Sequence, residues 1–301
     1  MPIRTWYVHA SLCCATALAL TWLVSSPAEA KPPAAGPLEE FATGIAGPEG
    51  LAFTSDGGLI VGTTTGDVLR FEPGGGSSVV ANVGEALAGI TVLRDGRILA
   101  ASLGPGRVWS IDEAGNTAEF ATGIGGPNFI VETRRGGRVF ATAALIGEIV
   151  DVTSGTPVTV ASGLSFPNGL AIGKHRGQRY LYVAESIAQQ VQRYPLDDND
   201  QLGPVEFIAA GLPIADGLAI DRGGNVIVVG GGQMNVIVRK TGLVEPLSTD
   251  PLLNWPSNVA FGRGRGFRRR EAYLANFGPA LGDGINIVRF RHSHSGTRTS
   301  R

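Results

Sequence analysis

Short apolar, β-branched runs separated by glycine-rich turns make up most of this 301-residue chain. Such runs predict strands and hairpins rather than helices. Between residues 50 and 81 the pattern predicts four successive strands, Gly50–Phe53, Leu59–Thr63, Asp67–Phe71 and Ser77–Ala81. Beyond residue 30, no window of 12 or more residues has helical periodicity, so we expect an all-β fold with almost no helix.

One junction in this pattern recurs six times. The ten residues 40–49 return 79 positions later as residues 119–128, with eight identities. Aligned on the residue before each apolar run, successive junctions are 39, 40, 40, 48 and 41 residues apart. A repeat of about 40 residues made of short strands is typical of a β-propeller. We therefore predict a six-bladed β-propeller with four-stranded antiparallel blades.

The sixth repeat is one strand short. After its junction it offers only Val259–Phe261, Ala272–Asn276 and Ile285–Phe290, whereas Leu38–Thr43 has an outer-strand sequence with no blade before it. Pairing this N-terminal strand with the last blade would close the ring and cover a sheet edge. The propeller is then expected to span residues 37–291, flanked by a linker and a disordered tail (31–36 and 292–301).

The first 30 residues have the three parts of an export signal. Arg4 provides the positive region, residues 12–24 are apolar, and Ala28-Glu29-Ala30 is a small-x-small cleavage site. A membrane anchor is the alternative, but the apolar run is shorter than the ~20 residues of a span. We expect cleavage after Ala30, a secreted or periplasmic protein and no membrane span afterwards. Both cysteines, Cys13 and Cys14, would leave with the signal, so no disulfide is expected.

The charge of the chain is nearly balanced, with 25 Lys and Arg against 26 Asp and Glu. A nucleic-acid-binding protein usually carries a strong basic excess, so no nucleic-acid partner is expected. The arginines between residues 263 and 270 are interpreted as a solvated loop. We expect a monomer.

The repeated junction also carries the candidate chemistry. The first strand of each propeller blade lines the central channel, so equivalent positions at its start should form a ring around the axis. Two carboxylates and two amide oxygens in such a ring make a site of hard oxygen ligands that suits Ca²⁺, and no Cys or His is present to favour a softer metal. The six ring positions are Glu49, Ala88, Asn128, Asn168, Asp216 and Ser257.

Each of these residues could also be an ordinary turn residue. Pro-Glu-Gly, Pro-Asn-Gly and Ala-Asp-Gly are common turn sequences at the start of a strand. Turn chemistry does not require the longer side chain of Glu49, however. Two carboxylates directed into one narrow channel would also repel each other unless a cation lay between them. The combined pattern therefore favours a metal site.

At these junctions the chain resembles the senescence-marker-protein/gluconolactonase/regucalcin family. The resemblance rests on Gly47-Pro48-Glu49-Gly50, on residues 166–170 and on Ala215-Asp216-Gly217-Leu218, while residues 181–186 also resemble strictosidine-synthase-like proteins. It covers the whole chain beyond the signal, in register at every blade. It implies a six-bladed propeller and a divalent-metal-dependent hydrolase, usually of lactones.

The same resemblance implies roles for particular residues. Glu49, Asn168 and Asp216 match the metal ligands of the family, and Asn128 matches a residue between metal and substrate. Asp216 also matches the acidic residue that acts as base or nucleophile. The implied cofactor is Ca²⁺, with Zn²⁺ or Mn²⁺ as alternatives.

The chain departs from the sugar-lactone members of the family beside Asn128. Those members often carry Arg two residues before this Asn and an acidic residue after it, whereas this chain has Gly126 and Phe129. Gluconolactone is therefore a doubtful substrate. The residues expected at the channel mouth indicate an apolar lactone or ester, with Phe129 and Trp255 as substrate contacts. Any one of these mouth residues could instead serve only core or loop packing; they are Leu145, Ile146, Ile187, Met234, Trp255 and Phe277.

Other chemistry is weakly supported by the sequence. His175 is expected on the outer rim, and His292 and His294 in the tail, so no Ser-His-Asp arrangement can be built at the channel. Glu185 is either a second acid or a plain rim residue. The main rival to a hydrolase is a non-catalytic binding scaffold with a structural ion, because the repeats also resemble NHL-type propellers. Strictosidine-synthase-like condensation chemistry is a third alternative.

Overall fold

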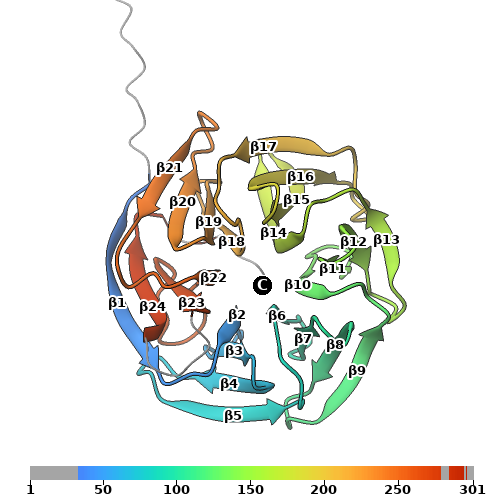
Figure 1. Cartoon of the computed structure of the whole chain (residues 1–301), viewed down its shortest axis with the longest axis vertical. Helices are drawn as coiled ribbons and strands as arrows, with labels where there is room; N and C mark the ends of the chain where they lie inside the picture. The colour runs from blue at the N-terminus through green and yellow to red at the C-terminus, as the bar shows by residue number, and fades with distance from the viewer. Residues whose placement is uncertain (1–32, 279–284, 295, 297–301) are drawn as a thin grey trace, which may run out of the picture. The chain divides into compact units, whose positions relative to one another are not determined.

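A ring of six four-stranded antiparallel sheets surrounds a central axis (Figure 1), which confirms the predicted six-bladed propeller. The computed structural model describes residues 33–278, 285–294 and 296, all in one compact unit, and the predicted signal peptide lies outside these residues. None of the described residues forms a helix, so this part of the chain offers no helix that could cross a membrane.

The first three blades follow one another along the chain, each numbered from its inner strand outward. Blade one contains β2 (Pro48–Phe53), β3 (Leu59–Thr63), β4 (Asp67–Phe71) and β5 (Ser77–Asn82). Blade two contains β6 (Ile90–Val92), β7 (Ile98–Ser102), β8 (Arg107–Ile111) and β9 (Thr117–Thr122). Blade three contains β10 (Pro127–Glu132), β11 (Val139–Ala143), β12 (Glu148–Asp151) and β13 (Val158–Ala161).

The next two blades have the same order, and the last takes its outer strand from the start of the chain. Blade four contains β14 (Pro167–His175), β15 (Gln178–Glu185), β16 (Gln190–Leu196) and β17 (Glu206–Ala210). Blade five contains β18 (Leu218–Ile220), β19 (Val226–Gly230), β20 (Gln233–Ile237) and β21 (Val244–Ser248). Blade six contains β22 (Pro256–Phe261), β23 (Glu271–Asn276), β24 (Ile285–His292) and β1 (Ala35–Thr43).

The ring closes as the sequence predicted. Strand β1 pairs antiparallel with β24, and Leu38 lies opposite Phe290, where both side chains are buried. The ends of the propeller differ by a few residues from the expected boundaries. Strand β1 begins at Ala35, within the expected linker, and His292 is a buried residue of β24 rather than part of a disordered tail.

Apolar side chains fill the spaces between neighbouring blades. Six buried clusters are present among the described residues, and each joins one blade to the next around the ring. The second strands β3, β7, β11 and β19 are buried along their whole length because both faces of each blade are covered. This packing explains why these strands are continuous apolar runs rather than alternating ones.

Candidate functional site

The predicted ring positions are linked around the axis by hydrogen bonds between neighbouring blades. The Gly89 N–H donates to the carbonyl oxygen of Asn128 (2.7 Å), and the Gly169 N–H donates to that of Asp216 (3.0 Å). The Ser257 hydroxyl donates to the carbonyl oxygen of Glu49 (3.0 Å) and joins the sixth blade to the first. The structure therefore brings together, at one end of the channel, residues that lie far apart in the sequence.

Glycine follows several ring positions because the neighbouring blade approaches closely there. A Cβ atom on Gly169 would lie 2.3 Å from the carbonyl oxygen of Asp216, and one on Gly89 would lie 2.3 Å from that of Asn128. Any side chain at these positions would separate the blades. The glycine of the repeated motif is thus required by the closeness of the ring rather than by turn geometry.

In five of the six blades, the residue two positions before the ring residue adopts a left-handed backbone conformation. The residues concerned are Gly47, Gly126, Phe166, Ile214 and Trp255, with φ between 45° and 74°. Three of them are bulky, and left-handed backbone is strained for bulky or β-branched side chains. This conformation turns each carbonyl oxygen toward the loop between the second and third strands, as in the hydrogen bonds Thr64 N–Gly47 O, Ser186 N–Phe166 O and Phe277 N–Trp255 O.

The ring contains unpaired oxygens. Among the described residues, six buried side-chain polar atoms lack a hydrogen-bond partner, and four of these are ring oxygens. A buried acceptor without a donor destabilises the fold, and such groups are rare unless an ion or water serves them. The residues therefore fit a divalent cation. The four atoms are Glu49 Oε2, Asn128 Oδ1, Asn168 Oδ1 and Asp216 Oδ1.

The two carboxylates influence each other. Burial raises the pKa of Glu49 to about 7, against a smaller lowering by a hydrogen bond with the Ser257 side chain. Burial raises the pKa of Asp216 well above its ordinary value, and repulsion from Glu49 raises it further, while the Asn168 side chain lowers it. The repulsion of Asp216 by Glu49 indicates that the two carboxylates lie near each other, and a cation between them would stabilise both in their charged form.

Asn168 is held in position by a short chain of hydrogen bonds. Its Nδ2 donates to the Ser186 hydroxyl (3.2 Å), which donates in turn to the carbonyl oxygen of Ala215 (2.8 Å). With Nδ2 engaged, Oδ1 is left free on the other side of the amide. Nearby Glu185 is 2% exposed and accepts hydrogen bonds from Ser165 N (2.7 Å) and Gln190 Nε2 (2.8 Å), so it supports this loop.

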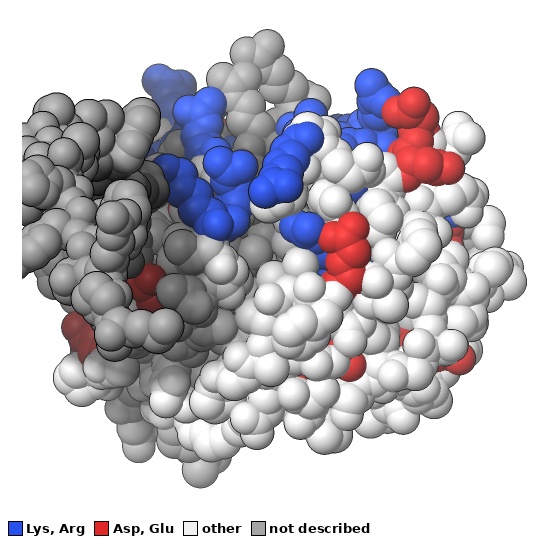
Figure 2. Space-filling view, turned by 90° about the horizontal axis from the view of Figure 1, so that it is seen from above, with Lys and Arg blue, Asp and Glu red and all other residues white. Residues whose placement is uncertain are grey.

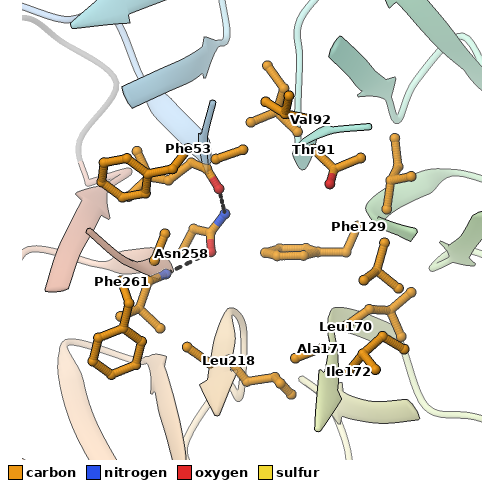
Figure 3. Close-up of a pocket in the computed structure, with 18 of the residues that line it drawn as sticks. Phe53, Thr91, Val92, Phe129, Leu170, Ala171, Ile172, Leu218, Asn258 and Phe261 are labelled. Carbon is orange, nitrogen blue, oxygen red and sulfur yellow. Dashed lines mark hydrogen bonds between the residues drawn. The ribbon is translucent and has the colours of Figure 1, made fainter. Parts of the chain in front are cut away.

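Below the ring, the inner strands surround a narrow cavity of about 180 Å³. Its walls are mostly apolar, and the Phe129 ring points into its centre toward Asn258 (Figure 3). Asn258 is held by its own strand, because its Oδ1 accepts from Val259 N (2.7 Å). Phe129 is 5% exposed and lines this cavity, and its role as a substrate contact stays a prediction.

The mouth of the channel is apolar. Trp255 is 53% exposed, and the other exposed apolar residues of this face are Leu145, Ile146, Ile187, Ile214 and Phe277. Met234, also expected here, is fully buried between blades five and six, so that expectation is wrong. Ile214 was missed by sequence reasoning. It stands two residues before the ring residue Asp216, as Trp255 does before Ser257, and this shared position was the available signal.

Leu145 explains why residue 126 has no side chain. A Cβ atom on Gly126 would lie 2.5 Å from Leu145 Cγ, and φ there is +74°. The loop after β11 therefore occupies the space in which an arginine at this position would lie. Blade three thus has Gly126 in place of the arginine of the sugar-lactone pattern because Leu145 packs against this position.

Charged side chains gather on the opposite face of the ring. Figure 2 shows Lys and Arg concentrated toward one face, while the other carries few charges. A pocket of about 520 Å³ on the basic face is lined by Lys174, Arg176, Arg222 and Arg239, among others. The balanced total charge of the chain thus conceals an uneven distribution.

Comparisons with known proteins confirm the predicted family resemblance. The model of the SMP-30/Gluconolactonase/LRE-like region matches residues 132–274, and that of the strictosidine synthase-like N-terminal region matches residues 40–71. The pentonolactonase XacC of Haloferax volcanii is 31% identical over 179 residues, which is 54% of this chain and 58% of that protein. The match therefore spans little more than half the length of this curated relative.

Solved structures share the fold over nearly the whole propeller. A gluconolactonase from Xanthomonas campestris has a TM-score of 0.70 at 18% identity, covering 88% of this chain and 96% of that one. A calcium-binding protein, regucalcin, from Agrobacterium tumefaciens has a TM-score of 0.65 at 16% identity, covering 86% and 93%. At these identities the likeness concerns the fold alone.

Proposed function

We propose that this protein is a divalent-metal-dependent hydrolase of lactones or esters. The observation that carries the proposal is the group of four buried, unpaired oxygens at one end of the channel. Glu49, Asn168 and Asp216 would hold the ion, with Ca²⁺ favoured because every donor is a hard oxygen. The matched relative is named a pentonolactonase, and one protein of similar fold is named a gluconolactonase. Another protein of similar fold is described as calcium-binding.

A bound divalent cation polarises an ester carbonyl and stabilises the negative charge that develops on its oxygen. Asp216 would serve as the general base, since its carboxylate lies in the ring and its Oδ1 is buried without a hydrogen-bond donor. In the proposed reaction, water adds to the carbonyl carbon and gives its proton to Asp216. The ring C–O bond then breaks, the alkoxide takes the proton back, and a hydroxy acid leaves. Direct attack by the Asp216 carboxylate is the alternative.

Asn128 would orient the carbonyl, since it lies in the ring between Ala88 and Asn168 and is itself 4% exposed. The apolar mouth favours a lactone or ester with a hydrophobic substituent, which would cover Trp255, Ile187 and their neighbours. The protein is further proposed to be exported and monomeric.

Activity measurements test the proposal. A panel of γ- and δ-lactones with alkyl substituents of increasing length should be hydrolysed with Ca²⁺ and not after chelation. Asp216→Asn should lower kcat by at least about 100-fold, the usual scale of general-base catalysis. Asp198→Asn, an exposed acid on blade four, is the matched control and should leave the rate unchanged.

Two results would count against a hydrolase. Turnover that ignores both the chelator and Asp216→Asn would place the chemistry elsewhere. Stabilisation by Ca²⁺ with no turnover on any lactone or ester would favour the rival, a binding scaffold with a structural ion.

A further inference from the structure

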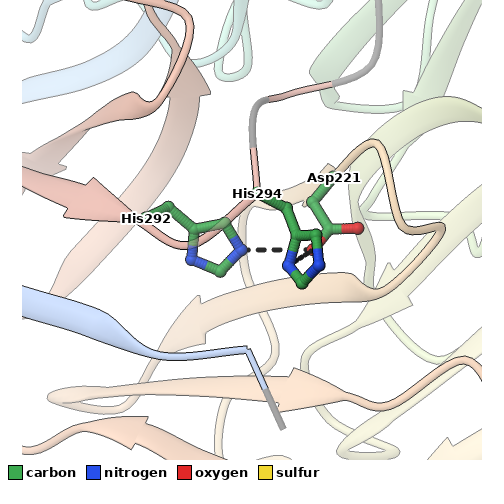
Figure 4. Close-up of side chains that lie close together, drawn as sticks. All are labelled: Asp221, His292 and His294. Atoms are coloured by element: carbon green, nitrogen blue, oxygen red, sulfur yellow. Dashed lines mark hydrogen bonds and ion pairs between the residues drawn. The ribbon is translucent and has the colours of Figure 1, made fainter. Parts of the chain in front are cut away.

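A second group of metal-binding side chains lies at the other end of the inner strand of blade five. Asp221 follows β18 directly, His292 ends β24, and His294 comes two residues later. The chain bends at Ser293 and His294 after β24, and both imidazoles lie at the same Asp221 carboxylate. Figure 4 shows the two imidazoles and the carboxylate directed toward one another.

The spacing of these groups suits a small ion. Asp221 Oδ2 lies 3.2 Å from His292 Nε2 and 3.6 Å from His294 Nδ1. Four ligands at the usual zinc bond lengths of ~2.0–2.2 Å stand about 3.3 Å from one another in a tetrahedron. One ligand atom from each of the three residues lies within 4.8 Å of the others. We propose that Asp221, His292 and His294 bind Zn²⁺, with water as the fourth ligand.

The burial of the group supports this site. Asp221 is 0% exposed and His292 is 1% exposed. Buried charged groups are usually paired or coordinate a metal ion. His294 is half-exposed, which leaves the fourth position open to solvent.

The turn that contains Asp221 does not need the histidines. Asp221 accepts hydrogen bonds from the N–H and Nδ2 of Asn225 (2.9 and 2.8 Å). Asp112 accepts the same pair from Asn116 (both 2.8 Å) in a turn of blade two, where no histidine lies nearby. The histidines at Asp221 therefore add something beyond the turn, and the Asp112 turn provides an internal control.

The site would reinforce the closure of the ring. It would join the end of β24 in blade six to blade five, next to the contact in which Ser293 N donates to Ala34 O (3.1 Å). A bridge between Asp221 and Gly296 already brings this segment to the turn. Because the described residues include no cysteine, no disulfide can perform this role there. A structural zinc ion would do so.

Basic side chains near the site repel a cation, so zinc binding there should depend on salt in a characteristic way. Lys174, Arg222 and Arg239 line a pocket that Asp221 also borders. Salt screens such repulsion. Zinc binding at Asp221 should therefore strengthen, or hold steady, as ionic strength rises.

Zinc titration of the full chain tests the proposal, which does not depend on lactone hydrolysis. The double variant Glu49→Gln/Asp216→Asn removes the carboxylates of the ring, so any remaining zinc must bind elsewhere. We expect this variant to bind one Zn²⁺ per chain by calorimetry and metal analysis. Adding His294→Ala should abolish this binding, whereas adding Asp112→Asn should preserve it. With Co²⁺ in place of Zn²⁺, a tetrahedral visible spectrum should appear and disappear with the same variants.

The outcomes distinguish this site from the ring. Loss of zinc binding in the double variant would overturn the proposal and leave Asp221 and His292 as a hydrogen-bonded pair. Zinc binding that survives His294→Ala with an unchanged affinity would overturn it as well. In otherwise wild-type protein, His294→Ala should leave Ca²⁺-dependent activity unchanged and remove the rise in Tm that Zn²⁺ produces.

Discussion

The hydroxyl of Ser257 donates a hydrogen bond to the main-chain carbonyl of Glu49 across 3.0 Å, although 208 residues separate them. This contact joins the sixth blade to the first at the level of the proposed metal site. Burial raises the pKa of the Glu49 carboxylate, and the Ser257 side chain lowers it to a smaller extent. The hydrogen bond that helps to close the ring therefore also helps to build the proposed metal site.

Ser257→Ala is expected to weaken both. A lost hydrogen bond with a buried acceptor costs about 1–2 kcal/mol of unfolding free energy. Without the hydroxyl, Glu49 would be harder to ionise, so the affinity for Ca²⁺ should fall as well. Denaturant unfolding and calorimetry measure the two effects. Ser154→Ala, in an exposed turn, should change neither, and equal behaviour of the two variants would contradict this role for Ser257.

The metal-free protein should lose stability as the pH rises, the reverse of the usual effect of a carboxyl group. The pKa of Glu49 is raised from 4.5 to about 7, so the folded state holds its proton over a range in which the unfolded state loses it. Stability is then fully present below pH 4.5 and falls as pH rises through about 7. A pKa raised from 4.5 to about 7 corresponds to a loss on the order of 3 kcal/mol of unfolding free energy across this pH range.

Chelated protein unfolded in denaturant between pH 5 and pH 8 measures this loss. Glu49→Gln should reduce the slope, with the remainder due to Asp216, whose pKa burial also raises. Glu113→Gln, in an exposed turn, should leave the slope unchanged. A wild-type profile that rises with pH over this range would show that Glu49 is stabilised as a carboxylate without any metal.

The strained backbone at Ile214 should be detectable as a stability difference. Ile214 has φ of +45°, whereas Ile187, also exposed at the mouth, does not adopt a left-handed conformation. Glycine relieves such strain, which costs about 1–3 kcal/mol, but it also makes the unfolded chain more flexible at either position. Ile214→Gly should therefore be more stable than Ile187→Gly by at least about 1 kcal/mol. The reverse order in thermal unfolding would contradict the strain.

The closing strand should contribute strongly to stability. Leu38 of β1 is 7% exposed and packs in the cluster between blades five and six. Leu38→Ala should cost about 2–4 kcal/mol, the usual cost of truncating a buried leucine. Val79→Ala, on the exposed outer strand of blade one, should cost less than about 0.5 kcal/mol. Similar losses in the two variants would mean that β1 is not essential to closure.

The sequence predicted the blades well because repetition reveals their spacing. In blade one, β3 and β4 have the predicted bounds, and β1 closes the last blade as expected. The ring oxygens could be found because one position recurs in every blade. The contacts of single residues could not be predicted, since nothing periodic marks them.

Two misjudged residues illustrate this limit. Met234 lies in the core between blades five and six rather than at the mouth, because it belongs to strand β20 and not to a loop. His292 is buried against Asp221 through a pairing of distant segments that no local pattern indicates.

Ca²⁺ titration of the wild-type protein, Glu49→Gln and Asp216→Asn, each followed by thermal unfolding, tests the shared cation most directly. We expect one Ca²⁺ per wild-type chain and a higher Tm on binding. Without metal, each variant should be more stable than the wild type at pH 8, because one of two repelling carboxylates has become neutral, and neither should respond to Ca²⁺. Variants that are less stable than the chelated wild type, or that gain as much from Ca²⁺ as it does, would show that these residues serve only the turns in which they lie.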